Sequence, residues 1–173
     1  PGIDDFLYVG RVAEQKQLFQ SYQLASEGHP QVAVIIGEAG IGKTSTAEMF
    51  LRRLALQQIP PDIIKGQAHD MGGRIPYQSL TAGLRIRLDK ENAPEDLLSD
   101  VWLSELTRLF PELLDRYPDL PEPLAGDTEF VRGRLFEAIT TFIQSLAEQS
   151  PIVLSLEDIQ WADLGTLDLL HYL

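Results

Sequence analysis

One run of residues, Gly37-Glu38-Ala39-Gly40-Ile41-Gly42-Lys43-Thr44, has the spacing of a phosphate-binding loop, GxxxxGK[ST]. Its glycines let the backbone curl so that consecutive N–H groups point toward one centre, where phosphate oxygens accept their hydrogen bonds. In such a loop the lysine reaches the β- and γ-phosphates, and the threonine hydroxyl holds Mg²⁺. An ordinary glycine turn is the alternative, but chance produces this pattern in only on the order of one chain per hundred of this length. We therefore predict a nucleotide site made by Gly37, Ala39, Gly40, Ile41, Gly42, Lys43, Thr44 and Ser45.

The elements that must position this loop can be read on either side of it. The apolar run 32–36 directly in front predicts a buried strand, and the residues behind predict a helix that opens at Lys43. The positive end of that helix dipole would also face the phosphates. Its apolar stripe is Ala47, Phe50, Leu51, Leu54 and Ala55. A second strand is expected at 63–68, so strand, helix and strand should form a parallel pair with a right-handed crossover.

A pair of carboxylates, Glu157 and Asp158, follows another apolar run at 152–156. Phosphoryl chemistry on a Mg²⁺-nucleotide uses one carboxylate to hold the metal through its water shell and another to orient or deprotonate the attacking water. Open parallel sheets bind ligands beyond the carboxyl ends of their strands, where we expect both this pair and the loop after residue 36. An acidic strand-to-loop corner is the alternative interpretation, and the intact phosphate loop upstream argues against it.

Composition limits the class of protein. The 173 residues suffice for one domain with a sizeable core, and 44% of them are hydrophobic. The absence of cysteine excludes disulfides and thiolate metal sites and fits a reducing, cytoplasmic compartment. No apolar run approaches the length of a membrane span. The net charge of -12 opposes contact with a polyanion, so we expect neither direct nucleic acid binding by this segment nor a membrane partner.

The rest of the chain alternates apolar helical patterns with breakers. Helices are expected at about 11–27, from Pro76 through Leu88, at 95–110, and from an N-cap at Asp127 to about residue 149. The stretch 117–123 contains three prolines and is expected to be an extended connector, with a proline-rich partner ligand as the alternative.

Three segments together resemble a known family: Val9-Gly10-Arg11, the loop 37–44, and residues 156–163. The chain is similar to the AAA-type ATPase module of signal-transduction ATPases with numerous domains (STAND), as found in large LuxR-type bacterial transcriptional regulators and beside some nucleotide cyclase and kinase domains. Pro76-Tyr77, 117–121 and 134–138 extend the likeness to nearly the whole chain. It implies an α/β P-loop fold over residues 1–173. In this fold a parallel sheet of strand order 5-1-4-3-2 lies between two layers of helices, which gives a three-layer αβα arrangement.

The resemblance also assigns roles to individual residues. It implies that Val9 and Arg11 flank the adenine of ATP or ADP and that Lys43 and Thr44 hold phosphate and Mg²⁺. Glu157 would take the metal-side position and Asp158 the water-activating one, with their order open because most relatives carry aspartate first. Relatives usually have glutamate directly after the arginine, whereas this chain has Val12 there and Glu14 two residues later.

Several other residues have a structural interpretation that we prefer. Trp161 is expected to pack beneath the metal site, because tryptophan chiefly contributes buried area. Asp163 is expected to cap the following helix. Two histidines have no second ligand at metal spacing, and two arginines should be solvated or paired with acids, although one of them could face a neighbouring subunit's nucleotide. These four residues are His69, His171, Arg132 and Arg134.

The chain ends at Leu173 within an apolar helical pattern, so we expect the N-terminal portion of a larger module, without its sensor strand and helical lid. The strand 32–36 would then lack neighbours, and the segment should be weakly stable alone or pair with another chain.

Three functions remain open. The first is a slowly hydrolysing ATP-binding switch that acts on other domains of the same chain, with hydrolysis weak or absent in this segment. The second is an active motor of the origin-recognition or remodelling type. The third is a scaffold that has lost the chemistry.

Overall fold

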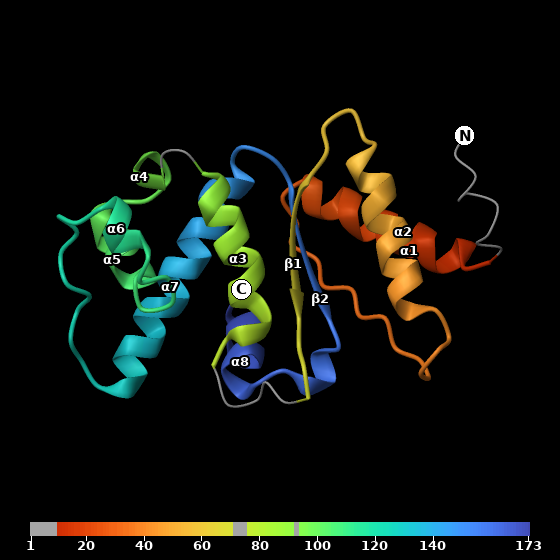
Figure 1. Ribbon diagram of the computed structural model, residues 1–173. Helices are drawn as coiled ribbons and strands as arrows, with labels where there is room; N and C mark the ends of the chain where they lie inside the picture. The colour runs from red at the N-terminus through yellow and green to blue at the C-terminus, as the bar shows by residue number, and fades with distance from the viewer. Residues whose placement is uncertain (1–9, 71–75, 92–93) are drawn as a thin grey trace. The chain divides into compact units, whose positions relative to one another are not determined.

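The computed structural model describes residues 10–70, 76–91 and 94–173. The chain divides into two compact units, one ending at Pro61 and the other running from Asp62 to Leu173. Figure 1 shows the elements of both. They are α1 (Val12–Ser26), α2 (Lys43–Ala55), β1 (Asp62–Gln67), α3 (Gln78–Lys90), α4 (Pro94–Leu97), α5 (Asp100–Leu106), α6 (Leu113–Arg116), α7 (Thr128–Ala147), β2 (Ile152–Glu157), the 3-10 helix η2 (Ile159–Trp161) and α8 (Leu164–Tyr172).

The first unit is built on α1 and α2, which pack together through aromatic and aliphatic side chains. The rings of Phe19 and Phe50 meet edge to face with centroids 5.2 Å apart, and Leu54 is fully buried. The apolar stripe expected on α2 is confirmed at Phe50, Leu51 and Leu54, which all lie in the interior. Burying such side chains contributes roughly 1.5–3 kcal/mol each, so this stripe is what holds the helix in place.

The prediction of a strand at 32–36 is wrong. Residues 31–38 carry no regular secondary structure, and the side chains of Val32, Val34 and Ile36 are 89%, 66% and 88% exposed. A strand needs a partner to receive its N–H and C=O groups, and the described part of this unit contains no other strand. Within the described residues of this unit, 32–36 therefore takes part in no parallel pair.

The second unit contains a parallel pair, β1 and β2, which confirms the strands expected at 63–68 and 152–156. Their register runs from Asp62 opposite Ile152 to Gln67 opposite Glu157. In the sheet order that the resemblance implied, these two strands are neighbours. Helix α3 packs closely against β1. A Cβ on Gly83 would lie only 2.1 Å from the Lys65 carbonyl oxygen. Only glycine permits such an approach.

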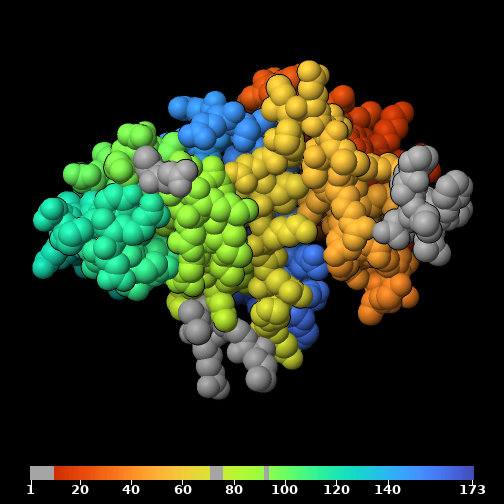
Figure 2. All heavy atoms as spheres, turned by 45° about the horizontal axis from the view of Figure 1, so that its top comes forward, coloured from red at the N-terminus to blue at the C-terminus, as the bar shows by residue number. Residues whose placement is uncertain are grey.

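The core of the second unit lies among α3, α5, α7, α8 and the sheet, and the helices from α3 to α6 present one continuous surface in Figure 2. Helices α3 and α7 bury the apolar stripes that their sequences predict. The buried cluster comprises Ile64, Leu80, Leu84, Leu88, Leu98, Leu103, Leu106, Phe110, Leu113, Leu135, Phe136, Ala138, Ile139, Phe142, Leu146 and Leu169. This cluster fixes the helices against which the acidic end of β2 is placed.

The single helix predicted at 95–110 is instead two, α4 and α5, because Ser99 takes an extended conformation (φ -65°, ψ 157°) between them. The connector at 117–123 contains no helix, as expected. The Ser104 hydroxyl of α5 donates to the Pro121 carbonyl of this connector (2.7 Å), and Arg108, just after α5, donates to the carbonyl of Leu124, the residue that follows the connector (2.6 Å). Asp127 caps α7 by accepting the Phe130 N–H at 2.9 Å, as predicted.

The described residues thus combine helices with a small parallel sheet, an α/β arrangement consistent with the predicted P-loop type of fold. Within those residues no helix is long and apolar enough to cross a membrane.

Candidate functional site

In the phosphate loop, the side chain of Lys43 is hydrogen-bonded to the backbone at the start of the same loop. The ammonium group of Lys43 donates hydrogen bonds to the carbonyl oxygens of Gly37 and Glu38, each at 2.9 Å. Gly40 and Gly42 have positive φ (79° and 93°), a conformation that glycine adopts without strain. In phosphate-binding loops, backbone of this kind directs successive N–H groups toward one concavity where an anion binds.

The helix behind the loop begins at Lys43, with Gly42 as its N-cap residue. Thr44 and Ser45 lie exposed in its first turn, where N–H groups that have no partner within the helix point out of its end. Thr46 is buried, and its hydroxyl donates to the Gly42 carbonyl at 2.8 Å. At the start of α2, the hydroxyls of Thr44 and Ser45, predicted to bind the ligand, are therefore exposed. The hydroxyl of Thr46 instead bonds the backbone at the end of the loop.

Arg11 joins α1 to the phosphate loop. Its guanidinium donates to the Ile41 carbonyl at 3.2 Å and forms an ion pair with Glu14 at 2.8 Å. The hydrogen bond from Arg11 lowers the pKa of the Glu14 carboxyl, and the glutamate thus stays charged beside the arginine. Two predicted site residues, Arg11 and Ile41, are brought together here, whereas Val9 lies outside the described residues.

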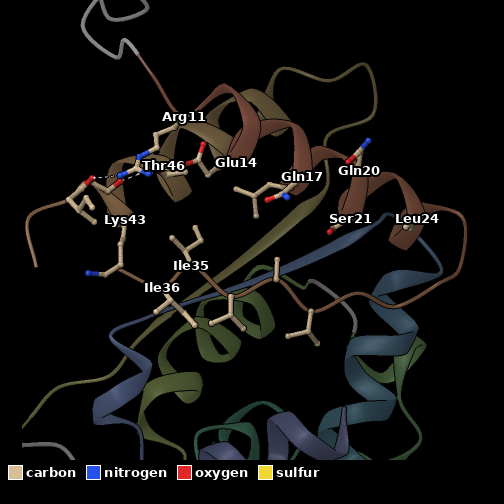
Figure 3. Close-up of a pocket in the computed structure, with 16 residues that line it drawn as sticks. Arg11, Glu14, Gln17, Gln20, Ser21, Leu24, Ile35, Ile36, Lys43 and Thr46 are labelled. Atoms are coloured by element: carbon tan, nitrogen blue, oxygen red, sulfur yellow. Dashed lines mark hydrogen bonds and ion pairs between the residues drawn. The ribbon is translucent and has the colours of Figure 1, made fainter. Parts of the chain in front are cut away.

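A cavity of about 590 Å³ opens between α1 and the segment 32–36 within the first unit. Figure 3 shows Arg11 and Lys43 at one end of it and Leu24 at the other. Polar side chains of α1, including Gln17 and Ser21, line it opposite apolar side chains of 32–36. Its volume lies within the range of about 300–1,000 Å³ that is usual for small-molecule sites. The phosphate loop is therefore the polar end of a space large enough for a nucleotide.

Sequence reasoning missed Gln15, a buried residue that links α1 to α2. Its side chain is 4% exposed, and its amide nitrogen donates to the Thr46 carbonyl at 2.7 Å, one turn into the helix that follows the loop. The amide oxygen of Gln15 is buried without a hydrogen-bond partner. The pattern of apolar residues could not identify a buried glutamine, and its position one turn after Arg11 was the only available signal.

The acidic pair lies at the end of β2 in the second unit. Glu157 is the last strand residue, and its carbonyl accepts the Ala68 N–H at 3.0 Å. Asp158 follows with left-handed backbone (φ 56°, ψ 38°), and its carboxylate accepts from the Gln67 amide at 3.2 Å. Gln67 ends β1 and was not predicted, although its place at the carboxyl end of an expected strand was a signal. The ladder thus fixes Glu157, and Asp158 is turned away from the strand path.

The turn after the acidic pair confirms one prediction and corrects another. Asp163 caps α8, accepting the Thr166 N–H at 2.9 Å, as expected. Trp161 does not pack beneath a metal site in the described structure: it is 47% exposed. Trp161 ends the short 3-10 helix η2, none of whose residues is buried.

The two histidines and two arginines for which a structural interpretation was preferred are exposed or paired with acids. His69 and His171 are exposed. Arg132 pairs with Asp168 at 3.0 Å, and Arg134 pairs at 3.2 Å with Glu105, whose side chain is 1% exposed. Burial acts to raise the pKa of Glu105, but hydrogen bonds from Arg108 and Arg134 outweigh it and leave the pKa below its ordinary value.

The groups present fit a phosphate-bearing ligand with a hard cation. Among the described residues no group of three or more histidine, aspartate or glutamate side chains could hold a metal by itself. Magnesium bound beside phosphates needs no such cage, because it keeps several waters and takes one or two protein oxygens. In the first unit Thr44 offers an oxygen of that kind and the Lys43 ammonium offers the charge for phosphate, and in the second unit Glu157 and Asp158 offer carboxylate oxygens.

Comparison with known proteins shows the family. No solved structure matches the chain. A family profile described as an AAA ATPase domain matches residues 8–173, which is nearly the whole sequence and includes the phosphate loop and the acidic pair. The chain therefore belongs to the AAA ATPase domain family.

Proposed function

We propose that this chain is an ATP-binding regulatory switch module that hydrolyses ATP slowly, in the manner of the STAND regulators that its sequence resembles. The observation that carries the proposal is the phosphate loop, whose Lys43 ammonium lies over the loop carbonyls of Gly37 and Glu38 at the start of α2. Phosphate oxygens would take these hydrogen bonds from the lysine, and the charged pairs so formed are roughly twice as strong as neutral ones.

The remaining roles follow from the chemistry of each group. Arg11 and Val9 would flank the adenine, and the cavity bounded by α1 supports this assignment with its size and its apolar wall. The resemblance assigns Mg²⁺ to Thr44 and Glu157, and the ion would supply charge stabilisation to the phosphates when it is bound. Asp158 would activate the attacking water. The ordering of Arg11 by Ile41 and Glu14 supports a nucleotide-sensing role, since a change in the loop would reach this guanidinium directly.

Nucleotide affinity of the Lys43→Ala variant tests the proposal. Removing a charged hydrogen bond of this type removes about 1.5–3 kcal/mol, so binding of ATP should weaken about 10- to 100-fold. Lys16→Ala is the matched control, because it deletes an exposed lysine from α1 in the same unit and should leave affinity unchanged. Titration of a fluorescent ATP analogue measures both. Equal affinity in wild type and Lys43→Ala would refute nucleotide binding by this loop.

Turnover separates the switch from a motor. A switch should hydrolyse ATP slowly and at a rate that DNA does not change, whereas a motor on nucleic acid should be stimulated by it. The net charge of -12 favours the switch, because a polyanion would be repelled. Strong stimulation of ATP turnover by DNA would favour the motor.

A further inference from the structure

We propose that Asp163 is a positioning residue for the acidic pair, beyond its role as a helix cap: its carboxylate ties the turn that carries Asp158 to the start of α3. The inference rests on the proposed function, in which Asp158 activates water. All the residues involved belong to the second unit.

The hydrogen bonds of Asp163 exceed what a cap requires. Its Oδ1 accepts the Thr166 N–H at 2.9 Å, and its Oδ2 accepts the Thr166 hydroxyl at 2.6 Å. An N-cap needs only a bond to the second or third helical N–H. Oδ1 also accepts the Tyr77 N–H at 3.1 Å, from a residue 86 positions earlier in the chain. That bond contributes nothing to capping α8 and joins two separate parts of the unit.

The Tyr77 end of this link is tightly packed. Tyr77 is the N-cap residue of α3 and has left-handed backbone (φ 64°), and its ring meets Phe136 edge to face at 5.9 Å. A Cβ on Gly165 would lie 3.0 Å from both the Tyr77 ring and Asp163 Oδ1. Burial acts to raise the pKa of Asp163, and the bonds from Thr166 and Tyr77 outweigh it and lower the pKa, which keeps the carboxylate charged. Asp163 therefore bonds to a rigid point.

The turn between the two aspartates is short and internally bonded. The Trp161 N–H donates to the Asp158 carbonyl at 2.9 Å, and the Ala162 N–H donates to the Ile159 carbonyl at 3.0 Å. On the other side, the ladder holds Glu157 through the Ala68 N–H. Asp158 thus lies between two fixed points, the sheet and Asp163. Left-handed backbone at a non-glycine residue persists where its surroundings over-determine it, and these two points supply that constraint.

Replacing Asp163 by serine separates positioning from capping. Serine caps helices about as well as aspartate, so α8 should stay intact, but its shorter side chain cannot also reach Tyr77. We expect Asp163→Ser to lower the rate of ATP hydrolysis by up to about 10²-fold, as small misplacements of reacting groups do, while ATP affinity stays within about twofold. Asp163→Asn keeps both the cap and an oxygen for Tyr77, so it should restore most of the rate.

The matched control is Asp127→Ser, which makes the same change at the cap of α7, where the Asp127 carboxylate accepts only the Phe130 N–H among the described residues. It should leave hydrolysis unchanged. Amide hydrogen exchange gives a readout that does not depend on turnover: in Asp163→Ser the amides of Trp161 and Ala162 should exchange faster while those of α8 stay protected.

The outcomes are distinct. If Asp163→Ser hydrolysed ATP at the wild-type rate and its residues 159–162 were as protected from exchange as in wild type, the positioning role would be overturned. Asp163 would then be only a helix cap. Equal ATP affinity of wild type and Lys43→Ala would instead overturn the proposed function, and the exchange result would still decide whether Asp163 holds the turn.

Discussion

At the scale of single residues, left-handed backbone at non-glycine residues coincides with positions that the sequence singled out. Among the described residues it occurs at Arg11, Tyr77 and Asp158. Two of these were predicted from sequence to serve the nucleotide, and the third is bonded by Asp163. For an L-residue this conformation is unfavourable by roughly 1–2 kcal/mol, although aspartate tolerates it better than most. The fold therefore holds Asp158 in a conformation that stability alone would not select.

A pair of substitutions at neighbouring carboxylates tests that strain. At Asp158, where φ is 56°, we expect the glycine variant to be more stable than the alanine variant by about 1 kcal/mol, because glycine has no Cβ to clash. At Glu157, within β2, the order should reverse, since glycine weakens a strand through its conformational entropy. Urea unfolding of the four variants measures both differences. The same order at both positions would show that Asp158 is not strained.

At the scale of elements, glycines decide how closely α3 approaches the sheet. A Cβ at Gly83 would lie 2.1 Å from the Lys65 carbonyl oxygen, and one at Gly66 would lie 2.0 Å from the Ser79 carbonyl oxygen. Both contacts are with backbone, which cannot move aside as a flexible side chain can. The position of α3, and with it the start at Tyr77 that Asp163 holds, depends on these two residues.

We expect Gly83→Ala to destabilise the protein by about 1–3 kcal/mol or more, the range for overpacking a filled interior. Gly133 is the matched control, because it also lies within a helix, α7, and nothing lies within 4 Å of where its Cβ would be. Gly133→Ala should stabilise by roughly 0.5–1 kcal/mol through helix propensity. Thermal or urea unfolding compares them, and stabilisation by both substitutions would contradict the close approach of α3 to β1.

What the sequence could predict follows from how local each signal is. The stripe of α7 and its cap at Asp127 depend on residues within a few turns, and both predictions are confirmed. The strand at 32–36 depends on partners elsewhere, and so does not form among the described residues despite its apolar run. The break at Ser99 within 95–110 left no proline or glycine to mark it.

The candidate site divides in the same way. The phosphate loop and the acidic pair could be predicted because each consists of consecutive residues of characteristic types. Gln15 and Gln67 had only a positional signal, and the link from Asp163 to Tyr77 had none, since each of these hydrogen bonds joins residues 31 to 91 positions apart. Their partners become visible only when the chain is folded.

At the scale of the whole molecule, charge sets the response to acid. The chain has 26 acidic and 14 basic residues, so 14 - 26 gives the net charge of -12. Self-repulsion among carboxylates would fall as pH is lowered, which by itself favours the folded state. A second effect opposes it. Four carboxyls among the described residues have resolved pKa shifts, and all four shifts are downward: Glu14, Glu95, Glu105 and Asp163.

The direction of the net effect follows from proton linkage. A carboxyl with a lowered pKa in the folded state stabilises that state above its unfolded pKa, about 4.3 for glutamate and 3.9 for aspartate. Below those values the unfolded chain binds more protons, so this stability is lost as pH falls toward the folded pKa. Because the four groups are held by specific hydrogen bonds while most other charges are screened by salt, we expect unfolding to become easier below about pH 4.3 at physiological ionic strength.

Glu105→Gln tests this account, because Glu105 is a buried partner of Arg108 and Arg134. At pH 7 the variant should be less stable by about 3–5 kcal/mol, since two arginines lose their buried counter-ion. Its stability should then fall less between pH 5 and pH 3 than that of wild type, so that the two curves converge in acid. Glu148→Gln, an exposed change in the turn after α7, should follow the wild-type curve. Urea unfolding at a series of pH values decides the matter: parallel curves for wild type and Glu105→Gln would show that acid sensitivity comes from the net charge and not from this buried carboxylate.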